Sequence, residues 1–221
     1  MLKKAGLLTA TLFLLTSLGL GQDGHYDVSA NAAAVFTKQS DGNGIAQSAT
    51  NGSDYFATIR LKFKPKHSVA FNYGRAKDSQ VYQTGFDFHI LTNITEYTGA
   101  YLYNPLKKGR FEPFVLAGAG ALVFNPQSTW VVLPNFTNNV PNRVQIDLGA
   151  VKQTEIAFLY GVGVDYQLPR FARFALRLQY RGFLYDAPDF KVNTASGGAV
   201  SLFTGAKGHM AEPSIGLVFR F

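Results

Sequence analysis

The chain has 221 residues and no cysteine, which excludes disulfide bonds and thiolate metal ligands. Lysine and arginine number 21 against 14 aspartates and glutamates, but these basic residues are spread along the chain and form no run or stripe, so no nucleic-acid binding is expected. Without the N-terminal leader predicted below, roughly 200 residues remain, the length of one domain.

The N-terminus has the composition of a secretory signal peptide. Lys3 and Lys4 precede an apolar run over residues 5–18, which is shorter than the roughly 20 residues of a membrane-spanning helix. The small residues Gly19 and Gly21 follow at the position that a signal peptidase reads. We therefore predict a cleaved signal peptide over residues 1–21 and one exported domain over residues 22–221.

The first predicted strands follow the leader with the two-residue alternation of a sheet that is apolar on one face. Residues 26–37 alternate alanines with Asp27 and other polar residues. Residues 54–64 place Arg60 and two lysines on one face and large apolar residues on the other. A two-residue turn then leads into a third strand over residues 67–76.

The fourth and fifth predicted strands differ in the clarity of their pattern. Residues 86–103 carry apolar residues in both registers, so only the lower half, with Glu96 facing inward and Tyr97 outward, gives a register. We expect a β-bulge near residues 92–95 to reset the upper half. Residues 111–124 alternate cleanly, with valines and alanines on one face.

The last three predicted strands cover residues 154–166, 173–181 and 207–221. In the second of these, arginines including Arg177 alternate with leucines and aromatic residues. The final strand has Glu212 on its polar face and ends on the aromatic Phe221. Each strand again has one apolar and one polar face.

Eight strands, joined by alternately short and long connections, are typical of a barrel with both chain ends on the periplasmic side. A sheet in hydrocarbon must close on itself, because each unpaired backbone amide costs several kcal/mol there. The predicted fold class is therefore all-β, an eight-stranded antiparallel up-and-down transmembrane β-barrel. Porins need wider barrels, so a general porin is excluded.

The polar faces of the strands predict a lumen filled by ion pairs, because a barrel of this size leaves room only for side chains. Buried charges are tolerated when they pair. We expect Arg177 and Glu212 to form the centre of this network, with Arg60 and Glu96 as further members. Other expected lumen charges are Lys62, Arg173, Arg181, Glu112, Glu155 and Asp165. Glycines at 118, 120, 161 and 163 are expected to leave room for the arginines.

Three stretches resemble the small OmpA-like outer-membrane β-barrels: residues 113–120 (PFVLAGAG), residues 160–166 (YGVGVDY) and the terminal Phe221. The resemblance covers the whole mature chain and implies a location in the bacterial outer membrane of a Gram-negative-type cell. It further implies contact with outer-membrane lipid and lipopolysaccharide. Phe221 resembles the signal that the barrel-assembly machinery reads. The chain resembles the barrel alone, without the peptidoglycan-binding domain of OmpA.

No catalytic, cofactor or metal site is predicted. The Gly-x-Gly pairs at 118 and 161 lie within strands and open no helix, unlike nucleotide-binding loops. The four histidines are scattered, without the spacing of metal ligands. We therefore expect a protein that is not an enzyme and needs no cofactor.

The long connection over residues 125–152 contains the only tryptophan, Trp130. Its apolar residues make Trp130 a candidate outer-loop contact, or else simply extend the neighbouring strands above the membrane. The predicted function is a structural or surface-interaction role for a monomer. Two alternatives stay open: a narrow, OmpW-like channel for small or apolar solutes, and a lipid A-modifying enzyme.

Overall fold

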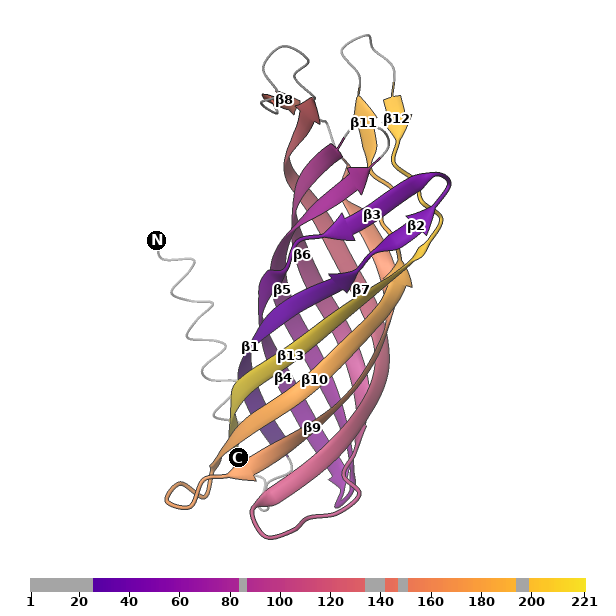
Figure 1. Ribbon diagram of the computed structural model, residues 1–221. Coiled ribbons are helices and arrows are strands. Elements are labelled where there is room, and N and C mark those ends of the chain that lie inside the picture. Colours follow the sequence, from indigo (N-terminus) through magenta and orange to yellow (C-terminus); the bar gives the residue numbers. More distant parts are fainter. Residues whose placement is uncertain (1–25, 84–86, 134–141, 147–150, 194–198) are drawn as a thin grey trace, which may run out of the picture.

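The computed structural model describes residues 26–83, 87–133, 142–146, 151–193 and 199–221. Long antiparallel strands form a closed, elongated barrel (Figure 1), in which each strand pairs with its neighbours in the chain and β1 pairs with the last strand. This arrangement confirms the predicted eight-stranded up-and-down barrel. Its strands are β1 (Tyr26–Lys38), β4 (Gly52–Lys64), β5 (His67–Gln83), β6 (Asp87–Tyr103), β7 (Phe111–Leu133), β9 (Gln153–Gln167), β10 (Phe174–Asp186) and β13 (Lys207–Arg220).

The ladder between β1 and β13 closes the barrel. It runs from the pair Asp27 and Arg220 to the pair Lys38 and His209. The backbone N–H of Phe221 donates a hydrogen bond of 3.1 Å to the carbonyl oxygen of Tyr26, so the terminal residue still belongs to the seam. Because no strand of the ring is left as an edge, the barrel satisfies its backbone groups internally, as hydrocarbon requires.

The outer face of the barrel is a belt of apolar side chains. Every second residue of the strands points outward, and Ile59, Phe71, Val162 and Leu217 are each about half exposed. These are positions that the alternation predicted to face lipid. Such a continuous exposed apolar surface suits a protein that sits in a bilayer. Within the described residues, no helix is long and apolar enough to span a membrane.

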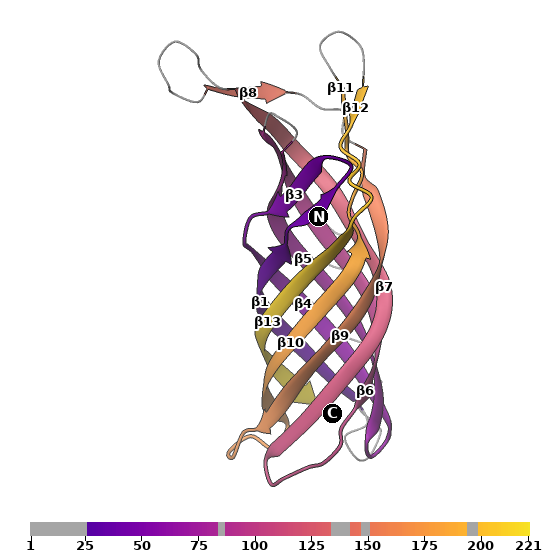
Figure 2. The ribbon, with the colours of Figure 1, turned by 45° about the vertical axis from the view of Figure 1, so that its right-hand side comes forward.

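The two ends of the barrel differ, as Figures 1 and 2 show. At the end where the C-terminus lies, only short connections join the strands, over residues 65–66, 104–110 and 168–173. At the other end β5, β6 and β7 continue past the apolar belt, and five short strands gather around them. These are β2 (Ser40–Gly42), β3 (Ile45–Ala49), β8 (Asn142–Ile146), β11 (Lys191–Asn193) and β12 (Ala199–Ser201). The predicted alternation of short and long connections is confirmed.

The hairpin of β2 and β3 illustrates how local sequence sets the upper end. Asn43 and Gly44 join the two strands with positive φ angles of 50° and 74°, as a tight turn between twisted strands requires. Beyond the turn, β3 pairs with the upper part of β5, from Ala46 opposite Gln83 to Ala49 opposite Gln80. The hairpin thereby covers an edge that β5 would otherwise expose above β4.

The register of β6 differs in part from the sequence prediction. Its lower half is as expected, with Glu96 buried and Tyr97 exposed. The expected reset within β6 is wrong, because the same alternation continues upward through the buried Ile94 and Ile90. The irregularity lies instead in β7, where Pro126 and Ser128 pair with consecutive residues of β6 and leave residue 127 as a bulge. Proline has no N–H to donate to the ladder, so a bulge suits this position.

The inward glycines act differently from the prediction. A Cβ on Gly118 would lie 2.1 Å from the carbonyl oxygen of Gly99, so this glycine permits a close approach of the β6 backbone. A Cβ on Gly163 would lie 2.4 Å from Cζ of Phe114. The Phe114 ring in turn has the guanidinium carbon of Arg177 at 5.3 Å from its centroid. The glycines therefore make room for backbone and for an aromatic ring, and only indirectly for arginine.

Candidate functional site

A first group of charges fills the lower part of the lumen. Arg60 Nε donates to Asp27 at 2.6 Å, and its Nη2 donates to Asp165 at 2.7 Å. Arg177, directly opposite Asp165 in the ladder of β9 and β10, donates to both oxygens of that carboxylate at 2.7 and 2.9 Å. All four side chains are at most 1% exposed. Each of these buried charges therefore has at least one opposite charge in contact.

The same network continues to the lower mouth of the barrel. Arg220 donates to Glu112 at 2.8 Å, and its Nη2 lies 3.6 Å from Asp165. Two lysines also reach Glu112, Lys107 at 2.8 Å and Lys62 at 3.7 Å. We define the lower cluster by its buried and partly buried charges, which leaves out Lys107 because its side chain is 59% exposed. Its members are Arg60, Arg177, Arg220, Lys62, Asp27, Asp165 and Glu112. Its four cations slightly outnumber its three carboxylates.

A second group, the upper cluster, surrounds a single cation. Arg181 donates to Glu96 through both terminal nitrogens, at 3.0 and 2.9 Å, and to Glu212 at 2.5 Å. The same Nη2 lies 3.4 Å from Asp54. Its guanidinium carbon also stands 3.5 Å from the centroid of the Phe56 ring. The upper cluster thus contains three buried carboxylates and one guanidinium.

The three carboxylates of the upper cluster have the spacing of a metal site. Their ligand atoms lie within 4.8 Å of one another. However, Nη2 of Arg181 contacts all three groups, so the guanidinium is the cation that their oxygens share. The donor set is therefore already engaged by the protein's own charge.

The sequence-predicted lumen residues Arg60, Glu96, Arg177 and Glu212 all lie inside the barrel. They divide between the two clusters instead of forming one centre. The predicted pairing of Arg177 with Glu212 is wrong, since the ladder of β10 and β13 places Arg181 opposite Glu212 and Gly216 opposite Arg177. A shift of four residues along a strand keeps the same face, which is why alternation alone did not separate the two arginines.

Two further residues that were predicted to join the lumen network, Arg173 and Glu155, belong to neither cluster. Arg173 is exposed in the short connection before β10, where its carbonyl oxygen accepts from the N–H of Arg220, so its predicted lumen position is wrong. Glu155 is partly buried near the upper end of β9 and forms no ion pair among the described residues. Conversely, Asp27 and Asp54 belong to the network although the sequence prediction did not include them. Both lie on the inward face of their strands, and this position was the available signal.

Apolar side chains fill the lumen above the upper cluster. Tyr82, Phe124 and Phe183 of the barrel wall are fully buried there, together with Phe190 and Leu202 from the segments around β11 and β12. The N–H of Leu202 donates to the carbonyl oxygen of Phe190 at 2.9 Å, which joins the two segments. The Tyr82 hydroxyl donates to the carbonyl oxygen of Pro188 at 3.0 Å. We call these five side chains the apolar plug.

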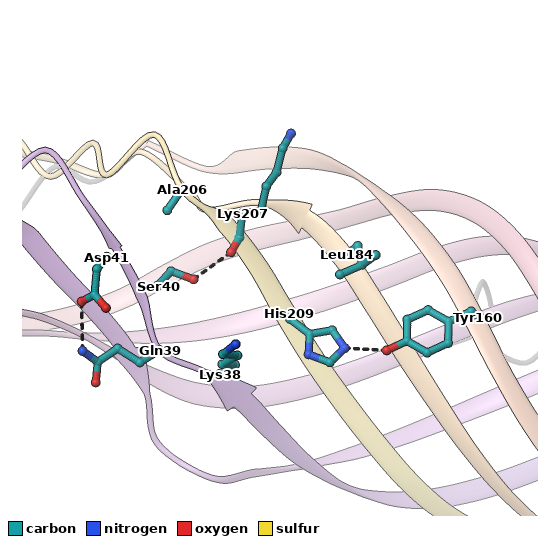
Figure 3. Close-up of a pocket in the computed structure, with 9 residues that line it drawn as sticks. All are labelled: Lys38, Gln39, Ser40, Asp41, Tyr160, Leu184, Ala206, Lys207 and His209. Atoms are coloured by element: carbon teal, nitrogen blue, oxygen red, sulfur yellow. Dashed lines mark hydrogen bonds between the residues drawn. The ribbon is translucent and has the colours of Figure 1, made fainter.

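A hollow of about 700 Å³ opens on the outer rim, beside β2 and the upper ends of β1, β10 and β13 (Figure 3). In it the hydroxyl of Tyr160 and Nε2 of His209 form a hydrogen bond of 2.6 Å, and the two rings are parallel. Tyr160 reaches His209 across β10 because Gly182, which lies between them, has no side chain. Other lining residues are Lys38, Gln39, Ser40, Asp41, Leu184, Ala206 and Lys207.

This hollow contains an outward-facing tyrosine–histidine pair that the sequence did not predict. The chain separates Tyr160 from His209 by 49 residues, so no local motif could join them. The Ser40 hydroxyl, which also lines the hollow, donates to the carbonyl oxygen of Lys207 at 2.9 Å. Ser40 is therefore held by backbone in this geometry, and not by the imidazole that would activate a nucleophile.

The two remaining candidate residues lie at opposite ends of the molecule. Trp130 lies in the upper extension of β7, where its backbone pairs with His89 on one side and Gln145 of β8 on the other. Residues 125–133 thus continue β7, whereas β9 begins only at Gln153. The contact role of Trp130 stays a prediction. The Phe221 ring packs edge-on against Phe219 at a centroid distance of 4.9 Å.

Comparison with solved structures identifies other barrels of the same kind. OprG, an outer membrane protein from Pseudomonas aeruginosa, has a TM-score of 0.62 and 13% identity, covering 89% of this chain and 95% of its own. A major outer membrane protein from Thermus thermophilus has a TM-score of 0.52 and 14% identity, covering 89% of this chain and 99% of its own. At such identities the likeness shows the fold alone. The chain matches no protein-family model and no curated protein.

Proposed function

We propose that this protein is a bacterial outer-membrane barrel with a structural or surface-interaction role and a lumen closed to solutes. The observation that carries the proposal is the filling of the lumen by the two charged clusters and the apolar plug. Arg60, Arg177 and Arg181 are each at most 1% exposed, so water does not surround them. A barrel whose axis is occupied by paired charges presents its loops and outer wall, and not its interior, to partners.

The same proposal includes the export route and the assembly of the barrel. It rests on the apolar belt, on the resemblance to OmpA-like barrels and on the fold shared with OprG. Residues 1–21 would be removed as a signal peptide, and Phe221 would be the terminal signal for the barrel-assembly machinery. The mature protein would be a monomer in contact with outer-membrane lipid and lipopolysaccharide, and Trp130 would serve as an outer-loop contact.

Planar-bilayer recording of the refolded protein tests the closed lumen. We expect no steady openings, because ions would have to displace buried, hydrogen-bonded arginines. Frequent openings of uniform size in the unmodified protein would contradict the proposal. Gel migration with and without boiling should first show that the preparation contains the folded barrel.

A narrow channel for small or apolar solutes is the second candidate, and the apolar plug favours it. An apolar upper lumen could receive an apolar solute if Phe190 and Leu202 moved away. The double variant F190A/L202A should then raise the uptake of small apolar solutes into vesicles, whereas deletion of residues 126–150 should not. For the closed barrel that we favour, neither change should alter uptake while the charged clusters below remain intact.

We infer no enzymatic activity, although the pair of Tyr160 and His209 makes a lipid A-modifying role testable. The imidazole faces outward at the upper rim, where lipid headgroups would lie. Incubation of the purified protein with lipid A, followed by mass spectrometry, should show no change in lipid mass. A mass change that His209→Asn abolished would establish the activity and overturn this part of the proposal.

A further inference from the structure

A cationic patch lies on the outer face of β5, β6 and β7, immediately above the apolar belt. Arg75 and Lys77 point outward from β5 and are exposed. The ladder places Thr95 beside Arg75, Asn93 beside Lys77, and Asn125 beside Asn93. These five residues line a hollow of about 310 Å³ together with Ala76 and Ile94. We call the five the Arg75–Lys77 patch.

The patch marks the level at which the outer wall changes from apolar to polar. One step below it, Tyr73 and Tyr97 are adjacent, with ring centroids 5.4 Å apart, and both face outward. Arg75 Nε donates to the Tyr73 hydroxyl at 3.0 Å, which ties the guanidinium to this aromatic pair. Tyrosines of membrane proteins concentrate at the height of the lipid headgroups. Arg75 and Lys77 therefore lie at headgroup height in the leaflet around the upper rim.

The charge of the patch distinguishes it from the hollow on the opposite side of the rim. None of its lining residues is acidic, and the neighbours on β4 at the same level, Ser53 and Tyr55, are uncharged. The Figure 3 hollow, in contrast, contains Asp41, and its Lys207 forms an ion pair with Asp186. Two cations with amide and hydroxyl donors around them, and no carboxylate, form a surface complementary to phosphate.

We infer that the Arg75–Lys77 patch binds the phosphate groups of a phosphorylated glycolipid in the leaflet around the upper rim. The inference rests on the proposed function, because it needs the barrel to sit in that membrane. Arg75 and Lys77 pair with the phosphate, Asn93, Thr95 and Asn125 hydrogen-bond to the phosphate or sugar, and Tyr73 and Tyr97 pack beside the upper acyl chains.

Native mass spectrometry of the folded full-length barrel, titrated with bisphosphorylated lipid A, tests this binding. The variant R75Q/K77Q should weaken binding at least about tenfold, since two charges at a headgroup surface are removed. The matched control K64Q/K66Q removes two exposed lysines at the opposite rim and should stay within about twofold of the unmodified protein. Dephosphorylated lipid A should bind the unmodified protein as weakly as R75Q/K77Q binds the phosphorylated form.

Equal losses in both double variants would show attraction by net charge alone and would overturn the inference. Inorganic phosphate that displaced the lipid at equal concentration would also overturn it, since the patch would then be a site for the free ion. The boiled and unboiled gel migration of each variant separates misfolding from lost binding. If the unmodified protein itself failed that gel test, the proposed membrane barrel would fail and not the patch alone.

Discussion

The two charged clusters in the lumen both pair arginines with aspartates and glutamates but differ in charge balance. In the lower cluster, Asp165 accepts from both Arg60 and Arg177, and each arginine also lies within 4 Å of Asp27. In the upper cluster, Glu96, Glu212 and Asp54 all depend on Arg181. The lower cluster therefore has redundant partners, whereas the upper cluster has one cation that nothing replaces.

Burial alone therefore does not rank the importance of a charge for the stability of the barrel. Arg60, Arg177 and Arg181 are equally inaccessible, yet removal of one lower arginine leaves another in place. Removal of a buried partner is costly because the remaining charge stays uncompensated. The contribution of each arginine to the free energy of unfolding should thus increase with the number of carboxylates that have no other cation in contact.

The largest effect is expected for Arg181→Met, which leaves three buried carboxylates without a cation. We expect the free energy of unfolding in lipid vesicles, measured by urea titration, to fall by about 3–5 kcal/mol. Arg177→Met is the matched control and should cost less than half as much, because Arg60 still contacts Asp27 and Asp165. Equal losses for the two variants would show that redundancy does not protect the lower cluster.

The sequence predicted which way most residues of the strands face, because the alternation of a strand has a period of two. Arg60, Glu96, Arg177 and Glu212 were all placed in the lumen for this reason. The sequence did not predict which of them meet, because a slip of two or four residues between strands preserves every face. Only the stagger of the closed barrel determines that Glu212 meets Arg181.

Contacts that require the registers of three strands at once could not be predicted from the sequence either. The contact of Tyr160 with His209 needs β9 and β13 to flank β10 at the height of Gly182. The Arg75–Lys77 patch likewise needs the registers of β5, β6 and β7 together. The prediction for Arg173 is wrong for a simpler reason: residue 173 lies in the connection just before β10, where alternation no longer decides the direction of a side chain.

A further buried acid lies above both clusters and extends the comparison to a carboxylate that has no cation in contact among the described residues. Asp78 is 4% exposed in the part of β5 above the apolar belt. Gln80 Nε2 donates to its Oδ2 at 2.7 Å, and the other oxygen has no hydrogen-bond partner among the described residues. Burial raises the pKa of Asp78 to about 7, and the hydrogen bond from Gln80 lowers it only in part.

The raised pKa of Asp78 predicts a stability that falls as the pH rises. Between about pH 4 and 7 the folded state keeps a proton that the unfolded chain has lost, so the slope is negative, and it levels off above about pH 8. The free energy of unfolding should therefore be larger at pH 4 than at pH 8. Asp78→Asn should remove about 2–4 kcal/mol of this difference, measured from urea midpoints at the two pH values. The control Asp41→Asn, an exposed carboxylate of the neighbouring hairpin, should leave the slope unchanged.

The smallest effect is expected for Glu212→Gln, and it makes the sharpest distinction between the clusters. The amide oxygen still accepts from Arg181, Glu96 and Asp54 remain to compensate the guanidinium, and one surplus negative charge disappears. The free energy of unfolding should therefore stay within about 1 kcal/mol of the unmodified protein. The matched variant Asp165→Asn should cost about 2–4 kcal/mol, because Arg60 and Arg177 then share only the carboxylate of Asp27. If Glu212→Gln instead lowered the free energy of unfolding more than Asp165→Asn, the upper cluster would need all three of its carboxylates ionised despite its single cation.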